Sequence, residues 1–336
     1  MLETVITSRI RLARNARELP YGRKLTATDE RLYSVLFDGA RRAAGAVGGE
    51  EFEFFMLQKM DDLDCRVMLE RRLISNDLLA KRDCAALLIS KKQNLSVMIN
   101  EEDHFRIQAF REGFDLERAH AAADKFDNAL SEVITLAYSP RFGYLSACPT
   151  NMGTGMRASV MMYLPALAMT KSLEGVLAAA GKAGMTARGI YGEGSDAVGF
   201  MYQLSNAMTL GRTEKEVLEQ VTQAVRGIAE QELKAREHLL AASQAEVKDK
   251  IFRTFACFKY AALMPRKELL DGISLLKLGT FYGFLTVPYS VANDLIAAAE
   301  PASLQKMVGK PLDEHGLNVA RAALVRERIK KYDVKN

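Results

Sequence analysis

A change of hydrophobic period near Gly211 constrains the fold of this chain more than any other feature of its sequence. Before it, short apolar runs alternate with helix-like stretches, and residues 95–99 (LSVMI) show the period-two pattern of a strand. After it, apolar residues recur at helical spacing from Val217 to Ile228, and strand signals become few. The sequence therefore predicts an α+β fold, with an antiparallel sheet of hairpin strands flanked by helices, followed by an all-helical C-terminal domain.

Individual elements follow from the same patterns. Apolar runs predict strands over residues 53–57, 84–89, 95–99, 144–148 and 200–204, and helical composition predicts helices over residues 116–130 and 157–169. Thr213-x-x-Glu216 is a capping-box pattern, which predicts that a further helix begins there. Because this helix fits either side of a boundary, we place the division near residue 235, with domains over residues 1–235 and 236–336.

Composition and the start of the chain exclude several classes of protein. The 336 residues suit one large domain or two, and no apolar run is long enough to predict a membrane span. The four cysteines include no Cys-x-x-Cys pair, which argues against a zinc site or a disulfide framework. A net charge of +4 is too small to indicate nucleic acid, and the first residues lack the pattern of a secretory signal. We expect a soluble cytoplasmic protein with no metal site of its own.

Arginines crowd the first strand-like segment, residues 7–14 (TSRIRLAR). In a strand, Arg9 and Arg11 project from the same face, and the planar donor fork of arginine suits phosphate oxygens. Together they could hold a polyphosphate. The segment alone does not decide between this function and a basic edge strand exposed to solvent.

Three adjacent acids, Glu101, Glu102 and Asp103, follow the strand predicted at residues 95–99. Neighbouring side chains point in different directions, so we expect only one of them to line a given site. A carboxylate there could clamp a guanidinium, coordinate magnesium or accept a proton. The alternative is a polar turn with acids near a helix N-terminus. His104 has no second histidine at ligand spacing, and we interpret it as structural.

Two loops of small residues complete the candidate segments. Residues 148–157 (CPTNMGTGMR) link a predicted strand to a predicted helix, where backbone N–H groups can approach anionic oxygens. Their spacing matches neither a P-loop nor a dinucleotide fingerprint. Cys148 there could be an activated thiolate or simply an apolar side chain. Residues 188–196 (RGIYGEGSD) carry one arginine and two acids among three glycines, which suits a mobile lid or a plain turn.

In this order and spacing, the four segments resemble the phosphagen kinase superfamily, and most closely its bacterial protein-arginine kinase branch. The matching stretches are residues 8–15 (SRIRLARN), 100–107 (NEEDHFRI), 148–159 (CPTNMGTGMRAS) and 188–195 (RGIYGEGS), with weaker similarity over residues 265–279 and 312–327. In members of the superfamily that act on free guanidino metabolites, a helical domain precedes the catalytic domain. Here the first arginine block lies at the start and a helical segment follows the catalytic blocks, so we expect the protein-arginine kinase layout.

The resemblance implies an activity and a role for each matched residue. The activity is transfer of the γ-phosphoryl group of ATP, with Mg²⁺, to arginine side chains of proteins. Two glutamates would grip the substrate guanidinium, and one or both would help to remove a proton from the attacking nitrogen, a choice that the sequence leaves open. The implied catalytic residues are Glu102, Glu193 and Cys148, and the implied nucleotide-binding residues are Ser8, Arg9, Arg11, Arg72, Arg106, Arg157 and Arg188.

Partners follow from the same resemblance, and two alternatives stay open. The implied partners are protein substrates with exposed arginines, an McsA-like activator, a Clp-type ATPase that would degrade marked proteins, and a second copy of the chain in a homodimer. The first alternative is a kinase for free arginine or another guanidino metabolite. The second is a non-catalytic adaptor that has kept only the fold, against which the intact Glu102, Glu193 and arginines argue.

Two positions depart from the family pattern. Arg72 precedes Leu-Ile-Ser where the family usually has a nucleotide-contacting histidine, and arginine could still meet a phosphate or the adenosine. In the tail, the family's Arg-Asp-x-x-Arg-Ala motif, which binds phosphoarginine, is replaced by residues 317–322 (LNVARA). Loss of the first arginine and the acid removes the phosphate fork and its partner, so we predict that activation by phosphoarginine is weak or absent.

Overall fold

The computed structural model describes residues 2–20, 25–189 and 197–335, and an eight-stranded antiparallel sheet forms the centre of this part of the chain. The strand order is β2-β3-β4-β5-β1-β8-β10-β9. The strands are β1 Val5–Arg14, β2 Phe52–Met56, β3 Ala86–Ser90, β4 Leu95–Ile99, β5 Phe105–Glu112, β8 Met156–Tyr163, β9 Met185–Gly189 and β10 Met201–Asn206, with a separate ribbon of β6 Tyr138–Ser139 and β7 Gly143–Tyr144.

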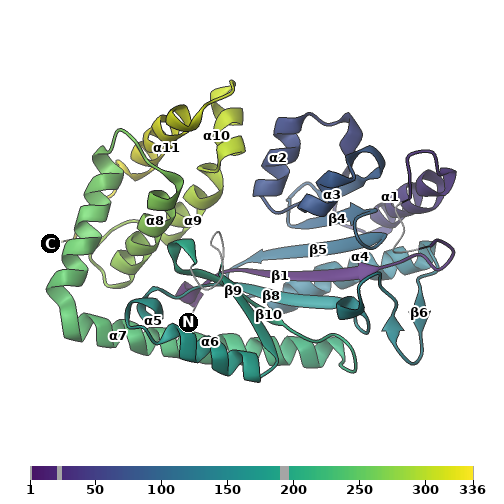
Figure 1. The fold of residues 1–336 in the computed structure, drawn as a ribbon, viewed down its shortest axis with the longest axis horizontal. Helices are drawn as coiled ribbons and strands as arrows, with labels where there is room; N and C mark the ends of the chain where they lie inside the picture. The colour runs from purple at the N-terminus through teal and green to yellow at the C-terminus, as the bar shows by residue number, and fades with distance from the viewer. Residues whose placement is uncertain (1, 21–24, 190–196, 336) are drawn as a thin grey trace.

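Helices surround this sheet and then continue alone to the C-terminus (Figure 1). Those that follow or link the strands are α1 Asp38–Ala46, α2 Asp62–Glu70, α3 Asn76–Ala80, α4 Leu116–Val133, α5 Pro165–Met169 and α6 Leu173–Lys182. After the last strand come α7 Glu214–Tyr260, α8 Arg266–Phe281, α9 Tyr289–Ala298, α10 Pro301–Val308 and α11 Glu314–Ile329. Within the described ranges, none of these helices is both long enough and apolar enough to cross a membrane.

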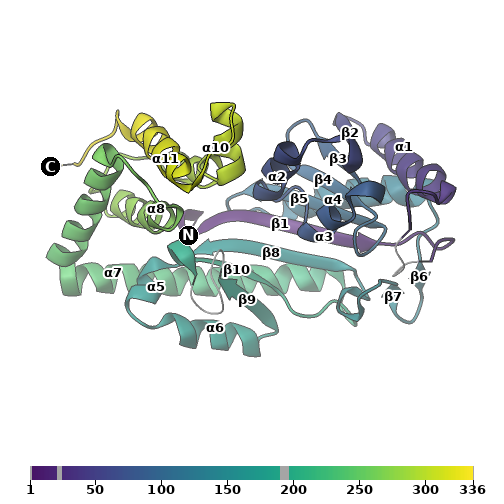
Figure 2. The same cartoon turned by 45° about the horizontal axis from the view of Figure 1, so that its top comes forward.

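Strand β1 lies in the middle of the sheet, between β5 and β8, and its two faces differ. Ile10 and Leu12 point to one face and are buried, whereas Arg9 and Arg11 point to the other and are partly exposed. The apolar face packs against α1, α4, α6 and α7 in the main hydrophobic core (Figures 1 and 2). On the opposite face, α2 and α3 cover one part of the sheet through a smaller core, which leaves the polar centre accessible.

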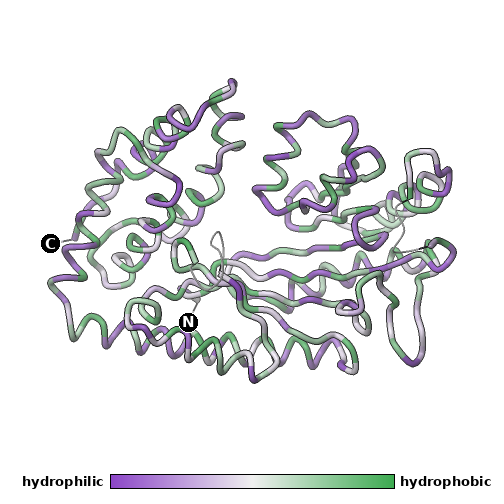
Figure 3. The backbone as a smooth tube through the Cα atoms, in the orientation of Figure 1, coloured by the Kyte–Doolittle hydropathy of each residue, from purple (hydrophilic) through white to green (hydrophobic). Residues whose placement is uncertain are grey.

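The helices after β10 build a second core. Helix α7 is 47 residues long and serves both cores, since residues between Val217 and Ala229 pack in the first and residues between Val247 and Phe258 in the second. Ser243, with φ −150° and ψ 48°, marks a kink between these two stretches. Figure 3 shows hydrophobic and hydrophilic residues alternating along these helices, as expected when each helix buries one face.

The structure confirms the α+β region with its antiparallel sheet and the all-helical tail, and it corrects two predicted elements. The helix predicted over residues 157–169 is wrong, because strand β8 occupies most of it and only the short α5 is helical. Alternation explains the strand: Ala158 and Val160 are buried while Arg157 is partly exposed. The strand predicted at 144–148 is reduced to the short β7.

The predicted start of the long helix is confirmed, because Thr213 and Glu216 form a reciprocal capping box at the N-terminus of α7. The Thr213 hydroxyl accepts the Glu216 N–H, and the Glu216 carboxylate accepts the Thr213 N–H. A boundary at residue 235 falls within this helix, and the division into residues 1–235 and 236–336 stays a prediction.

Candidate active site

Three neighbouring strands bring arginines from distant parts of the chain to the polar face of the sheet. Arg11 of β1 lies directly opposite Arg157 of β8, and Arg106 of β5 lies opposite Ala13, two residues further along β1. Arg9 shares the face of Arg11 because side chains two apart in a strand point the same way. These arginines form a group that we call the arginine cage: Arg9, Arg11, Arg106 and Arg157.

The charge of the cage is compensated only in part, because Glu101 pairs with Arg106 while Arg9, Arg11 and Arg157 have no ion pair among the described residues. Burial, followed by the charges of Arg72, Arg106 and Arg157, lowers the pKa of Arg9 to about 9. Burial and the neighbouring arginines also lower the pKa of Arg11 well below its usual value. The Arg11 Nε is buried and has no hydrogen-bond partner among the described residues. Clustered positive charges with an unpartnered buried donor suit a bound polyanion, because anionic oxygens satisfy both the charge and the N–H groups.

Uncharged side chains orient two of the guanidinium groups. Arg9 Nη2 donates to Gln203 Oε1 at 2.9 Å, and Arg157 Nη2 donates to Ser205 Oγ at 2.9 Å. Both acceptors lie on β10, which the register places next to β8. Neutral partners fix the direction of each guanidinium without cancelling its charge, so the cage keeps its affinity for an anion.

The three adjacent acids separate, as expected, and only Glu102 is exposed. Glu101 is buried and accepts a hydrogen bond from Arg106. Asp103 is buried and accepts from Asn15 Nδ2 at 2.6 Å. Desolvation, then the charges of Asp103 and Glu101, raise the pKa of the Glu102 carboxyl. A carboxylate with a raised pKa is a stronger base. Of the three acids, Glu102 is the one exposed at this end of the cage.

Asp103 also ties the Cys148 loop to the acidic turn. Its carboxylate accepts the Ser146 hydroxyl at 2.8 Å and the Ala147 N–H at 2.7 Å. Cys148 follows directly, with its Sγ 3.0 Å from Thr150 Oγ1. These contacts bring the Cys148 and Glu102 segments together, although they lie far apart in the sequence. The glycines of the loop serve packing, since a Cβ on Gly155 would lie 2.6 Å from Arg14 Nη1.

Ser8, Arg188 and Glu193 differ in how the structure places them. The structure does not bring Ser8 into the group, because its buried hydroxyl lies on the opposite face of β1 and donates to Gly113 O at 2.8 Å. Arg188 is exposed on β9, opposite Gln203, and its charge contributes to lowering the pKa of Arg157. Glu193 lies outside the described residues.

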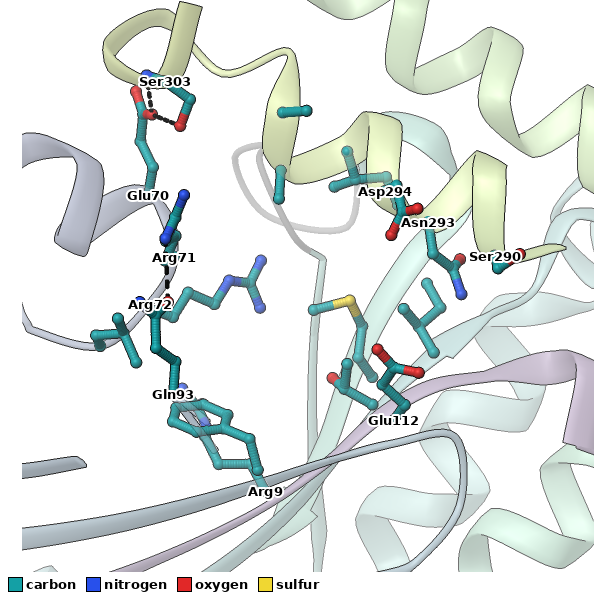
Figure 4. A pocket seen from close by; sticks show the side chains of 18 of the residues that line it. Arg9, Glu70, Arg71, Arg72, Gln93, Glu112, Ser290, Asn293, Asp294 and Ser303 are labelled. Atoms are coloured by element: carbon teal, nitrogen blue, oxygen red, sulfur yellow. Dashed lines mark hydrogen bonds between the residues drawn. The ribbon is translucent and has the colours of Figure 1, made fainter. Parts of the chain in front are cut away.

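A cleft of about 700 Å³ opens beside the cage, and Figure 4 shows it from close by. Arg9 and Arg72 line one side, together with Ser159 and Gln203. Its other wall comes from helices α9 and α10, which no sequence motif connected with this site. Gln203, Ser159 and these helices are the parts of the site that the sequence missed, and they join it only through the sheet register and the packing of the tail.

Comparisons with known proteins identify the family to which the chain is similar. The model of the ATP:guanido phosphotransferase C-terminal catalytic domain matches residues 40–235. The model of the protein-arginine kinase McsB C-terminal domain matches residues 244–336. Together the two models cover most of the sheet region and most of the helical tail.

Individual relatives agree with both models. The protein-arginine kinase of Caldanaerobacter subterraneus subsp. tengcongensis is 37% identical over 329 residues, covering 98% of each chain. That of Clostridium kluyveri is 38% identical over 97% of this chain and 94% of its own. Among solved structures, the duplicated taurocyamine kinase of Schistosoma mansoni has a TM-score of 0.59 at 27% identity, over 68% of this chain and 32% of that one. Lombricine kinase shares the fold, with a TM-score of 0.58 at 24% identity over 72% of this chain and 68% of its own. The chain therefore belongs to the ATP:guanido phosphotransferase family, within its protein-arginine kinase branch.

Proposed function

We propose that this protein transfers the γ-phosphoryl group of ATP to arginine side chains of other proteins. The observation that carries the proposal is the arginine cage, whose four guanidinium groups outnumber the buried carboxylate of Glu101, and next to which Glu102 is the exposed acid. A triphosphate needs cations on several sides, and a guanidinium needs a carboxylate. Both requirements are met on one face of the sheet. The protein-arginine kinases to which the chain is similar support arginine as the acceptor.

The cage arginines would act mainly by position and charge. Phosphoryl transfer spreads negative charge over the equatorial oxygens, and fixed cations stabilise that charge without reorganisation. Arg11, Arg106 and Arg157 surround one region from three adjacent strands, and Arg188 stands next to Arg157. Arg9 and Arg72 would hold the remaining phosphates where the cage meets the cleft.

Magnesium would enter with the nucleotide. The described residues contain no group of three histidine, cysteine, aspartate or glutamate side chains that could hold a metal ion. Mg²⁺ is commonly held by substrate phosphates and water with few protein ligands, which suits such a site. Its contribution would be to neutralise phosphate charge beside the arginines.

The acceptor guanidinium presents the second problem, because it is protonated and a poor nucleophile. Glu102, together with Glu193, would grip it and orient one nitrogen toward the γ-phosphorus. As the N–P bond forms, the bond between the γ-phosphorus and the β–γ bridging oxygen breaks, and the nitrogen loses a proton to a carboxylate. The raised pKa of Glu102 suits it to take that proton. Cys148 would lie beside the guanidinium.

The wider setting follows from family membership. We propose protein substrates with exposed arginines, whose modification would mark them for a Clp-type ATPase, an McsA-like activator, a homodimer and a cytoplasmic location. The lengths matched in the protein-arginine kinases, 98% and 94% of those chains, support this group over metabolite kinases.

The test is incubation with ATP, Mg²⁺ and an unfolded arginine-rich protein, with free arginine in a parallel reaction. Products are followed by mass spectrometry without acid, since N–P bonds are acid-labile. We expect phosphoarginine on the protein and none on the free amino acid. Phosphorylation of free arginine alone would move the chain to the metabolite kinases, and no transfer to either would favour an adaptor.

Glu102→Gln and Glu193→Ala separate chemistry from nucleotide binding. Both carboxylates would face the guanidinium, so each variant should lose transfer while calorimetry shows nearly unchanged ATP affinity. Loss of nucleotide binding in either variant would show that its role has been assigned wrongly.

A further inference from the structure

The direction in which a nucleotide would lie along the cage and the cleft follows from the strands. Arg11 and Thr7 share a face of β1, four residues apart, or about 13 Å of strand. Arg11 belongs to the cage, whereas Thr7 lines the cleft together with Met161 of β8 and Glu112 of β5. A nucleotide with its terminal phosphate among Arg11, Arg106 and Arg157 therefore runs past Arg9 and enters the cleft with its nucleoside end.

The size and lining of the cleft suit a nucleoside. Its volume of about 700 Å³ lies in the range of pockets that hold small molecules. Phe110, Met161, Leu73 and Ile296 supply apolar contacts of the kind that a base requires. Polar groups stand at the edge, as in sites that fix the orientation of a flat ligand.

Helix α9 provides the polar wall that faces Arg72. Figure 4 shows Asn293 and Asp294 of α9 across the cleft from Arg72, with Glu112 of the sheet below Asn293 in the view. Asp294 is exposed and forms no hydrogen bond or ion pair with the residues that the structure describes. Asn293 is different, because its Oδ1 accepts a hydrogen bond from the buried Lys277 at 3.0 Å. With Oδ1 occupied by Lys277, the Asn293 amide N–H groups are left to donate elsewhere.

A second contact holds this wall against the catalytic sheet. The Glu70 carboxylate, at the end of α2, accepts the N–H groups of Ala302 at 2.6 Å and Ser303 at 2.9 Å, and the Ser303 hydroxyl at 2.9 Å. It therefore caps the N-terminus of α10, the helix that follows α9. Because Arg71 and Arg72 come directly after Glu70, this cap links the position of the tail to the side of the cleft that carries the guanidinium of Arg72.

We propose that Asp294 and Asn293 of the helical tail recognise the nucleoside half of ATP, so that the tail is part of the nucleotide site. This inference rests on the proposed kinase function and deepens it. Asp294 accepts hydrogen bonds from the ribose hydroxyls, a pairing that carboxylates make in other nucleotide sites. Asn293 donates its amide N–H groups to acceptors on the edge of the base.

Calorimetric binding of ADP, 2′-deoxy-ADP and inorganic tripolyphosphate tests the proposal without any protein substrate. For Asp294→Asn we expect ADP affinity to fall about tenfold, as for the loss of a hydrogen bond to a charged group. The variant should lose the preference for ADP over 2′-deoxy-ADP that the unaltered protein shows. Asn293→Ala should also lower the affinity for ADP. Tripolyphosphate, which reaches only the cage, should bind all of these proteins equally.

Two further variants keep the test decisive. Glu246→Ala removes an exposed acid of α7 that does not line the cleft, and it should change none of the affinities. Glu112→Gln changes the acid on the sheet side of the cleft. If Glu112→Gln removes the preference for ADP over 2′-deoxy-ADP and Asp294→Asn keeps it, Glu112 of the sheet recognises the ribose and the proposal is overturned.

Failure of the proposal and failure of the kinase function give different results. If the unaltered protein binds ADP and makes phosphoarginine while the α9 variants match it in every affinity, only the role of the tail is lost. If the unaltered protein binds neither ADP nor tripolyphosphate, the kinase function fails and the proposal falls with it.

Discussion

The two faces of strand β1 hold arginines in opposite ways. Arg14 points to the core, where its Nε and Nη2 donate to Asp127 at 2.9 and 2.7 Å and its Nη1 donates to Thr154 O at 3.0 Å. Its guanidinium also lies 3.5 Å above the centre of the Tyr144 ring. Arg11, three residues earlier, points to the cage and meets other arginines. An arginine that stabilises the fold has acceptors for its N–H groups, as Arg14 does. An arginine that binds a ligand keeps N–H groups without acceptors, as Arg11 does.

Buried arginines of the helical tail extend the comparison. Arg321 donates to Ala299 O and Met264 O, both at 2.9 Å, which places it with Arg14. Arg236 has a buried ion pair with Glu232 at 2.8 Å, although its two Nη atoms have no partner among the described residues. Arg236 is thus an exception to the rule: its guanidinium packs against Phe281, 4.7 Å from the ring centre, and holds the fold although donors remain unpaired.

The largest expected effect is on catalysis, from Arg11→Ala. Removing one charge-stabilising arginine from a phosphoryl-transfer site costs about 10³-fold or more in kcat. The free energy of unfolding should stay the same or rise, because the remaining arginines repel one another less. Kinase assays and urea unfolding of the same protein preparation check both parts. A clear loss of stability would show that Arg11 is structural and would break the comparison.

Arg14→Ala should have the reverse outcome. Asp127 would be left buried without its partner, and breaking such a pair costs about 3–5 kcal/mol of folding free energy. Urea unfolding measures the loss. The matched control is Arg14→Met with Asp127→Leu, which removes both charges and should recover a large part of the stability. If the double variant is no better than Arg14→Ala, the ion pair is not the cause.

Nucleotide should stabilise the fold through the cage. Saturation at a hundred times the dissociation constant adds about 2.7 kcal/mol to the free energy of unfolding. We expect this rise with ATP and Mg²⁺ in the unaltered protein, and its loss in Arg11→Ala at the same nucleotide concentration. Thermal unfolding followed by calorimetry measures both. Equal stabilisation of the two proteins would mean that the nucleotide binds elsewhere.

The smallest expected effect is that of free phosphoarginine on the kinase rate. Arg321 is buried and committed to backbone carbonyls and to Asn318 Oδ1 at 2.9 Å, so it resembles Arg14 and not the cage. We therefore expect little or no change in rate across a phosphoarginine titration. A saturable rise would show that the tail recognises phosphoarginine despite Leu317 and Asn318.

Local patterns predicted much of this fold. Residues 95–99 and the capping box at Thr213 needed only a few neighbouring residues, and both are as expected. Strand β8 was missed because its apolar run is compatible with a helix when it is judged by composition. The signal that identifies it is the alternation of Arg157 and Ser159 with Ala158 and Val160.

The site was predictable only in part. Sequence order placed Arg9 and Arg11 on one face, but only the antiparallel register brings Arg157 opposite Arg11. Asn293 and Asp294 carry no local signal, because they reach the cleft through the packing of a tail whose position depends on contacts such as the Glu70 cap. Side chains assembled by long-range packing cannot be found from spacing alone.

The length of α7 determines how the molecule comes apart. At 1.5 Å per residue its 47 residues measure about 70 Å along the helix axis, which bends at Ser243, and both cores pack on it without a loop between them. Neither core can give up its part of the helix without weakening the other, so heat should melt them in one cooperative transition. The connection between them is exposed around the kink at Ser243, but it is helical on both sides, so it offers a protease no extended loop. The sheet and the tail therefore persist, or are lost, as one body.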